Sequence, residues 1–163
     1  MDGEETIIQE LLKFGQEIMD KYKIYPYVSF VVKNNVIISK GFNRTTVGQE
    51  LDNGDISQQA EVVATRQALV ALEIKELSRC SLYSLMEPTI LGFDAALWSG
   101  IKRFVWCINK TSVSHRYNKI RYSLLDYLTS HPGEIFIKHG IYEKEALKLI
   151  QTAQQNHYYP DNL

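Results

Sequence analysis

Hydrophobic residues recur at three- and four-residue steps over residues 5–23 of the chain. This spacing places them on one face and predicts a helix with one buried side. Two β-branched runs follow at residues 28–32 and 36–39, and they are joined through Asn34 and Asn35. Because asparagine tolerates the positive φ of a tight turn, these residues predict an antiparallel hairpin.

Beyond the hairpin, short apolar runs alternate with segments of helical pattern. The polar residues 45–57 indicate a loop, and Ser57 then stands where the N-cap of a helix ending near Glu73 would lie. A later helix should contain Pro88 in its first turn and stop at Gly100. The remaining predictions are strands at 82–85, 104–108 and 134–137, and helices at 117–128 and 143–154.

A hairpin followed by alternating strands and helices predicts a fold of the α/β class, with a mixed sheet covered by helices on both faces. The predicted strands number five, so the expected architecture is a three-layer α/β/α sandwich. With 163 residues, of which 45% are hydrophobic, the chain fits one domain over residues 1–163. Its core should span about residues 5–154, with a short polar tail after them.

Charge and cysteine content limit the expected binding partners and the expected cellular compartment. A net charge of -1 gives no basic field of the kind that attracts nucleic acid or membranes, so we expect neither as a partner. The locally basic residues 115–121 are better explained as a solvated helix entry. Cys80 and Cys107 are too few and too distant for a disulfide framework, and the chain shows no signal-peptide pattern. We therefore expect a cytoplasmic protein.

Two short segments carry the residues of chemical interest. The first runs from Gly41 to Arg44 and continues over residues 55–68, with the triplet Gln59-Ala60-Glu61 inside it. The second runs from Leu82 to Gly92, with Glu87-Pro88-Thr89 inside it, and continues over residues 95–101. Together they resemble the cytidine and deoxycytidylate deaminase superfamily, specifically its branch of guanine, cytosine and tRNA-adenosine deaminases. The resemblance extends over about residues 5–154 and implies a cytidine deaminase-like fold.

In that family a His-Ala-Glu triplet opens one helix and a Pro-Cys-x-x-Cys segment opens the next, and the histidine and both cysteines bind one zinc ion. Here Gln59 replaces the histidine, while Ala60 and Glu61 match. Thr89 and Gly92 occupy the two cysteine positions. Zinc requires Cys, His or carboxylate donors, so the resemblance implies a degenerate member without the zinc ligands, and we expect no metal and no cofactor.

Loss of the metal should impair hydrolysis. Bound zinc lowers the pKa of water from about 15.7 to about 7, which corresponds to roughly 12 kcal/mol of help in forming the nucleophile. A carboxylate base such as Glu61 typically contributes about 3 to 5.5 kcal/mol. Glu61 is therefore interpreted as a retained catalytic position that is vestigial. A carboxylate in the first turn of a helix is also favourable for dipole reasons alone.

The altered pocket could still bind a ligand. By resemblance, Asn43 hydrogen-bonds the substrate base in the purine-type deaminases, although it could equally do no more than end the hairpin strand. With Asn43, the expected ligand-binding residues are Gln59, Ala60, Thr89 and Gly92. We expect unpaired backbone N–H groups at both helix starts to face this pocket, and the absent side chain of Gly92 to leave space in it.

Three functional hypotheses follow. The first is a catalytically degenerate homologue that binds a base- or nucleotide-like ligand or a protein partner. The second is an active hydrolytic deaminase of nucleobases, nucleosides or tRNA adenosine, with unorthodox or metal-free catalysis. The third is a subunit that pairs with an active deaminase, which the resemblance to eukaryotic tRNA-adenosine deaminases suggests. The family's dimers also imply a homodimer, with Phe93, Leu97 and Trp98 at the interface.

Overall fold

The computed structural model describes residues 3–44, 55–113, 124–129 and 133–158. Its five-stranded sheet has the strand order β2-β1-β3-β4-β5. The strands are β1 (Val28–Lys33), β2 (Val36–Phe42), β3 (Ser81–Met86), β4 (Arg103–Ile108) and β5 (Phe136–His139). β1 runs antiparallel to both β2 and β3, whereas β3, β4 and β5 are mutually parallel. The predicted mixed sheet is therefore confirmed.

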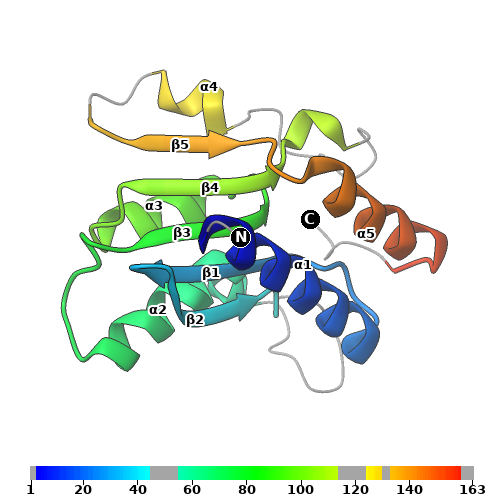
Figure 1. The fold of residues 1–163 in the computed structure, drawn as a ribbon, viewed down its shortest axis with the longest axis horizontal. Helices are drawn as coiled ribbons and strands as arrows, with labels where there is room; N and C mark the ends of the chain where they lie inside the picture. Colours follow the sequence, from blue (N-terminus) through cyan, green and yellow to red (C-terminus); the bar gives the residue numbers. More distant parts are fainter. Residues whose placement is uncertain (1–2, 45–54, 114–123, 130–132, 159–163) are drawn as a thin grey trace.

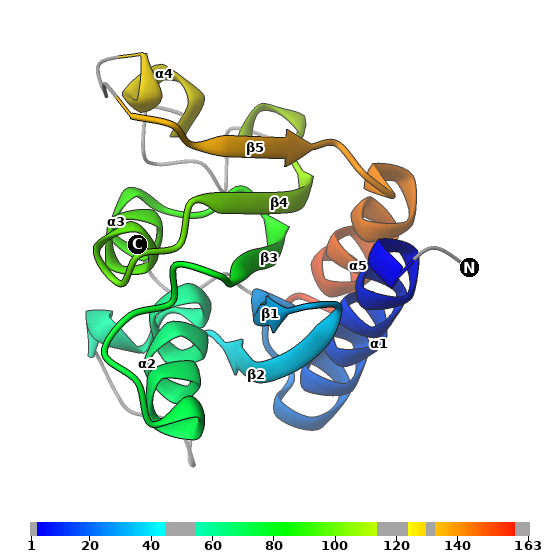
Figure 2. The ribbon, with the colours of Figure 1, turned by 60° about the vertical axis from the view of Figure 1, so that its left-hand side comes forward.

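Helices cover both faces of this sheet, as Figures 1 and 2 show: α2 and α3 lie on one face, and α1 and α5 lie on the other. The α-helices are α1 (Gly3–Tyr22), α2 (Ala60–Leu72), α3 (Ile90–Trp98), α4 (Leu124–Leu128) and α5 (Glu143–Gln155), and the short 3-10 helices are η1 (Ile56–Gln58) and η2 (Lys110–Ser112). The three-layer α/β/α sandwich is thus confirmed. No helix within the described ranges has both the length and the apolar composition needed to cross a membrane.

Each face of the sheet packs against its own apolar core. Ile8 and Leu11 of α1 pack toward Val105 on one face. On the other face, Phe93 of α3 packs against Phe104, with ring centroids 4.5 Å apart. Successive residues of β4 are buried because helices cover both of its faces, which explains the uninterrupted apolar run in the sequence.

The hairpin prediction is also confirmed. Val32 pairs with Ile37 and Lys33 pairs with Val36, so Asn34 and Asn35 form the turn between the strands. Both asparagines have positive φ, at 50° and 61°. This is the conformation that two-residue hairpin turns require, and asparagine adopts it at low cost.

Element boundaries differ from the predictions at four places. Asp55, not Ser57, has the capping side chain, and it caps η1; the N-cap residue of α2 is Gln59. Pro88 precedes α3, whose N-cap is Thr89. The last strand begins two residues later than expected because its pairing with Arg103 begins at Phe136. The fourth helix is observed from Leu124, and residues 45–54 and 117–123 of the predicted loop and helix lie outside the described residues.

Candidate functional site

The sequence segments of interest converge at the carboxyl end of β3. Helix α3 begins there, directly after Glu87 and Pro88, and α2 packs beside α3 on the same face of the sheet. Strand β2 approaches the start of α2 closely at Gly41, where a Cβ atom would lie 2.1 Å from the carbonyl oxygen of Ala60. Only glycine permits this approach, and it brings Asn43 to the first turn of α2.

The three positions that the resemblance aligns with the family's metal ligands are joined by hydrogen bonds. The hydroxyl of Thr89 donates to Oε1 of Gln59, across 30 positions in the sequence. The same hydroxyl oxygen accepts a hydrogen bond from the backbone N–H of Gly92 at 3.0 Å. Thr89 is therefore an ordinary N-cap of α3 that also ties α3 to the start of α2. The backbone N–H of Gly92, the hydroxyl of Thr89 and Oε1 of Gln59 thus form one continuous series of hydrogen bonds.

Glu61 occupies the space beside Gly92. Its side chain is buried, with 8% of the residue exposed. A Cβ atom built on Gly92 would lie 2.8 Å from Oε2 of Glu61 and 2.9 Å from its Cβ. The expectation that Gly92 leaves empty volume is therefore wrong, because the carboxyl group of Glu61 fills it.

The environment of Glu61 favours its neutral form. Burial raises the pKa of Glu61 from 4.5 to about 7, and a hydrogen bond from its own backbone N–H lowers it only in part. Desolvation penalises the charged carboxylate because burial removes the water that would otherwise hydrate it. Glu61 is thus a group that changes charge near neutral pH.

Asn43 caps the start of α2. Its Oδ1 accepts a hydrogen bond from the backbone N–H of Ala60 at 3.0 Å, while its own backbone N–H donates to the carbonyl of Tyr27. The N–H of Ala60, like that of Gly92, therefore has an acceptor within the protein. The expectation of unpaired N–H groups is wrong for these two positions.

Glu87 is a buried residue of the site to which the sequence analysis assigned no role. It is 8% exposed, and its Oε2 accepts a hydrogen bond from the backbone N–H of Lys110 at 2.9 Å. Its Oε1 accepts a hydrogen bond from the backbone N–H of Leu124. Glu87 thereby holds two segments beyond β4 against the end of β3. The position of this carboxylate between an apolar strand and Pro88 could have marked Glu87 as a buried polar residue. Its partners could not be predicted because they are distant in sequence.

The donor set at the three ligand positions does not fit zinc. Glutamine and threonine are poor zinc ligands, and glycine has no side chain that could bind the metal. Within the described ranges, no group of three or more His, Cys, Asp or Glu side chains could hold a metal ion. Cys80 lies before the start of β3, at the other end of the strand, and burial raises the pKa of the Cys107 thiol to about 12. Of the four histidines, His139 and His157 are described and belong to no such group, and His115 and His131 lie outside the described residues.

The residues expected at a dimer interface differ in exposure. Phe93 is fully buried and belongs to the core, so its assignment to an interface is wrong. Leu97 is half-buried and packs against the same core. Trp98 is 95% exposed at the end of α3. Leu91, on the same helix, and Val70, on α2, are also exposed.

Sequence comparison finds deaminases. The chain is 28% identical over 108 residues to a probable cytosine deaminase of Schizosaccharomyces pombe, covering 65% of this chain and 60% of that protein. It is 30% identical over 104 residues to a tRNA-specific adenosine deaminase of Aquifex aeolicus, covering 64% of this chain and 65% of that protein. The chain thus spans less than two thirds of the length of these curated relatives. No family model matches it.

Structure comparison agrees on the fold. A solved structure of NE0047 in complex with 2,6-diaminopurine has a TM-score of 0.76 at 20% identity, covering 94% of this chain and 82% of that one. A guanine deaminase from Nitrosomonas europaea has a TM-score of 0.74 at 20% identity, covering 90% of this chain and 82% of that one. The fold is that of the nucleobase deaminases. Relatives and neighbours together support a relationship with the cytidine deaminase superfamily.

Proposed function

We propose that this chain is a catalytically degenerate homologue of the nucleobase and nucleoside deaminases, which binds a base- or nucleotide-like ligand, or a protein partner, without zinc-dependent hydrolysis. The hydrogen-bonded series from Gly92 through Thr89 to Gln59 is the observation that carries this proposal. These atoms lie at the positions assigned to the family's zinc ligands and are hydrogen-bonded to one another. Metal chemistry would require replacing them.

The polar groups where α2 and α3 meet favour ligand binding over a purely structural role. Asn43, Thr89 and Gln59 present polar atoms at the meeting point of α2 and α3, and Glu61 adds a carboxyl group that can be neutral or charged near pH 7. The NE0047 structure contains 2,6-diaminopurine, which supports a nucleobase as the class of ligand. A base offers edge donors and acceptors for such a set of side chains.

An active deaminase with unorthodox or metal-free catalysis is the second candidate. The observation in its favour is the pKa of Glu61, about 7, because a general acid–base works best when its pKa lies near the operating pH. Elemental analysis and an ammonia-release assay with guanine, cytosine and adenosine distinguish the two candidates. We expect no stoichiometric zinc and no ammonia. Ammonia release that disappears in Glu61→Gln would establish the second candidate.

The role of Asn43 in binding can be separated from its role in capping. Asn43→Asp keeps an oxygen that can accept from Ala60 N–H but loses the amide donor. We expect this variant to keep its melting temperature while its affinity for guanine, cytosine or their nucleosides, measured by calorimetry, falls about tenfold. Gln67→Ala, an exposed change on α2, should alter neither quantity. Unchanged affinity in Asn43→Asp would restrict Asn43 to capping.

We propose that the partner at the α2–α3 face is a second copy of this chain. Trp98→Asp is expected to weaken self-association at least about tenfold in sedimentation experiments, because an exposed aromatic side chain is a typical interface anchor. The only other tryptophan, Trp106, is buried, so protection from iodide quenching at high protein concentration reports on Trp98. Val36→Asp, which alters an exposed residue of β2, is the matched control. A wild-type chain that stays monomeric at micromolar concentration contradicts this proposal.

A further inference from the structure

A cavity lies at the opposite end of the sheet from the candidate site. Its volume is about 420 Å³, and its lining includes Ser81 and Arg103, the first residues of β3 and β4. Glu87 lies just beyond the other end of β3, so a strand of this length separates the cavity from the candidate site by roughly 20 Å. The cavity and the candidate site therefore share no lining residue among those described.

The cavity is lined mainly by charged and polar side chains. Arg79, Arg103 and Lys138 provide three cations, and Glu4 provides the one carboxylate. Tyr83 and Ser81 add hydroxyl groups. Three cations against one anion leave an excess of positive charge in a chain whose net charge is -1. Such a lining selects for an anionic ligand.

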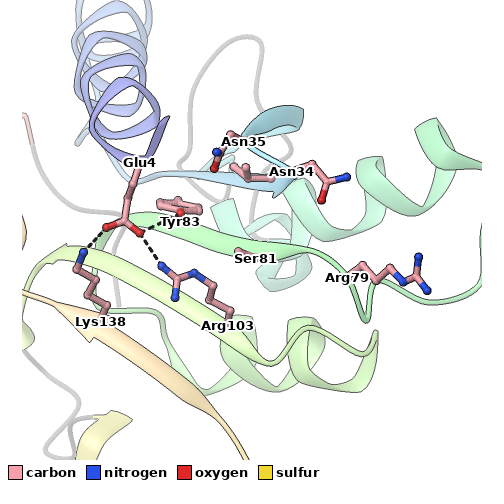
Figure 3. Close-up of a pocket in the computed structure, with 9 residues that line it drawn as sticks. Glu4, Asn34, Asn35, Arg79, Ser81, Tyr83, Arg103 and Lys138 are labelled. Carbon is pink, nitrogen blue, oxygen red and sulfur yellow. Dashed lines mark hydrogen bonds and ion pairs between the residues drawn. The ribbon is translucent and has the colours of Figure 1, made fainter. Parts of the chain in front are cut away.

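Glu4 shows how an oxyanion sits in this cavity. Figure 3 shows its carboxylate reaching from the first turn of α1 to the basic side chains of β4 and β5. One oxygen accepts a hydrogen bond from Arg103 Nη2 at 2.6 Å, and the other is paired with Lys138. The hydroxyl of Tyr83 lies 3.4 Å from the oxygen that Arg103 contacts. Two cations from neighbouring strands thus converge on a single acidic group.

The charge state of Glu4 fits this arrangement. Burial raises the pKa of Glu4, but the hydrogen bonds and charges of Lys138 and Arg103 outweigh that effect and hold the pKa below its ordinary value. The carboxylate therefore neutralises one of the two cations that it contacts. Arg79 forms no ion pair or hydrogen bond with any described residue, and Figure 3 shows it on the side of the cavity away from Glu4.

We propose that this cavity is a binding site for the phosphoryl group of a small phosphorylated molecule, in which Glu4 acts as an internal competitor. A phosphoryl group carries up to two negative charges and three acceptor oxygens, so it can satisfy Arg103, Lys138 and the Tyr83 hydroxyl together. Glu4 offers one charge and two oxygens to the same groups. The cavity also has room for more than a phosphate ion, since small-molecule sites begin at about 300 Å³. This proposal is independent of the function proposed for the other site.

If Glu4 competes with the ligand, replacing Glu4 should raise the affinity for the ligand. A purely structural ion pair would give no such increase. Calorimetric titrations of the full chain with inorganic phosphate, 5′-AMP and adenosine, at constant ionic strength, should show saturable binding of the phosphorylated probes. Glu4→Gln should bind them about tenfold more tightly because the internal anion is removed, whereas Lys138→Gln, which removes a cation that the phosphoryl group would contact, should bind them about tenfold more weakly. Lys13→Gln, an exposed change on α1, should have no effect.

The probes separate the sources of the phosphoryl group. Equal affinity for phosphate and 5′-AMP identifies free phosphate as sufficient, and tighter binding of 5′-AMP identifies a phosphorylated small molecule. Both results support the site if they respond to Lys138→Gln and not to Asn43→Asp. If neither phosphorylated probe binds saturably to the wild-type chain or to Glu4→Gln, the proposal is wrong. Binding that Glu4→Gln leaves unchanged or weakens would leave Glu4 as a structural ion-pair partner only and would also overturn it.

Discussion

Glu61→Gln is expected to raise the free energy of unfolding at pH 8 by about 3 kcal/mol. Burial raises the pKa of Glu61 to about 7, against 4.5 for an ordinary glutamate. The folded state therefore binds more protons than the unfolded state between these pH values, and stability falls as pH rises through this window. Each unit of pKa difference corresponds to about 1.4 kcal/mol, so the full cost of burying the charged carboxylate is present above pH 7. Glutamine has nearly the same shape and no charge.

Chemical denaturation of the wild type and of Glu61→Gln at several pH values tests this expectation. The difference between the two should be near zero at pH 4, grow between about pH 4.5 and 7, and level off above that range. Glu17→Gln, at an exposed position of α1, should follow the wild type throughout. A pH-independent difference between Glu61→Gln and the wild type would mean that the carboxylate is hydrated in the folded protein.

The sheet and its layers could be predicted because their signals are local or periodic. The positive φ at Asn34 and Asn35 follows from residue type, and the continuous apolar run of β4 follows from burial on both faces. Capping was harder to predict. Asp55 and Ser57 are both good N-cap residues, and Asp55 caps η1, while α2 receives its cap from Asn43, which directly follows β2.

The proximity of the two segments was predictable, but the contacts between their side chains were not. Motif spacing placed Gln59 and Thr89 at the starts of adjacent helices, where the structure finds them hydrogen-bonded. Sequence spacing contains no information on whether the carboxyl group of Glu61 points into the pocket or against Gly92, because that depends on packing between α2 and α3. The buried partners of Glu87 depend on chain segments that come together only in the folded state.

Introducing the family's ligands is expected to create a zinc site. Gln59→His, Thr89→Cys and Gly92→Cys together place one imidazole and two thiolates at helix starts that already lie within hydrogen-bond reach of one another. Gly92 does not have positive φ, so its backbone accepts a side chain. We expect zinc at about 1,000 times its dissociation constant to stabilise this triple variant by about 4 kcal/mol, and to leave the wild type unchanged.

Without zinc, the triple variant should be less stable than the wild type by about 1 to 3 kcal/mol. The new Cβ atom at Gly92 would lie 2.8 and 2.9 Å from Oε2 and Cβ of Glu61, so α2 and α3 must adjust and the carboxyl group must leave its position. We expect zinc binding to return more readily than ammonia release, because the helix starts are fixed while substrate contacts depend on other segments.

The matched control is the variant with Gln59→His, Thr89→Cys and Gly92→Ala, which introduces the same Cβ atom without the thiol. It should show the same loss of stability in the metal-free state and a far smaller response to zinc, because only two ligands remain. If the triple variant does not fold, adding Glu61→Ala removes the carboxyl group from the contact and provides a second test. A folded triple variant whose thermal denaturation does not respond to zinc would mean that the three positions do not converge as metal ligands. In that case the assignment of Gln59, Thr89 and Gly92 to the family's ligand positions, and the proposed function that depends on it, would be wrong.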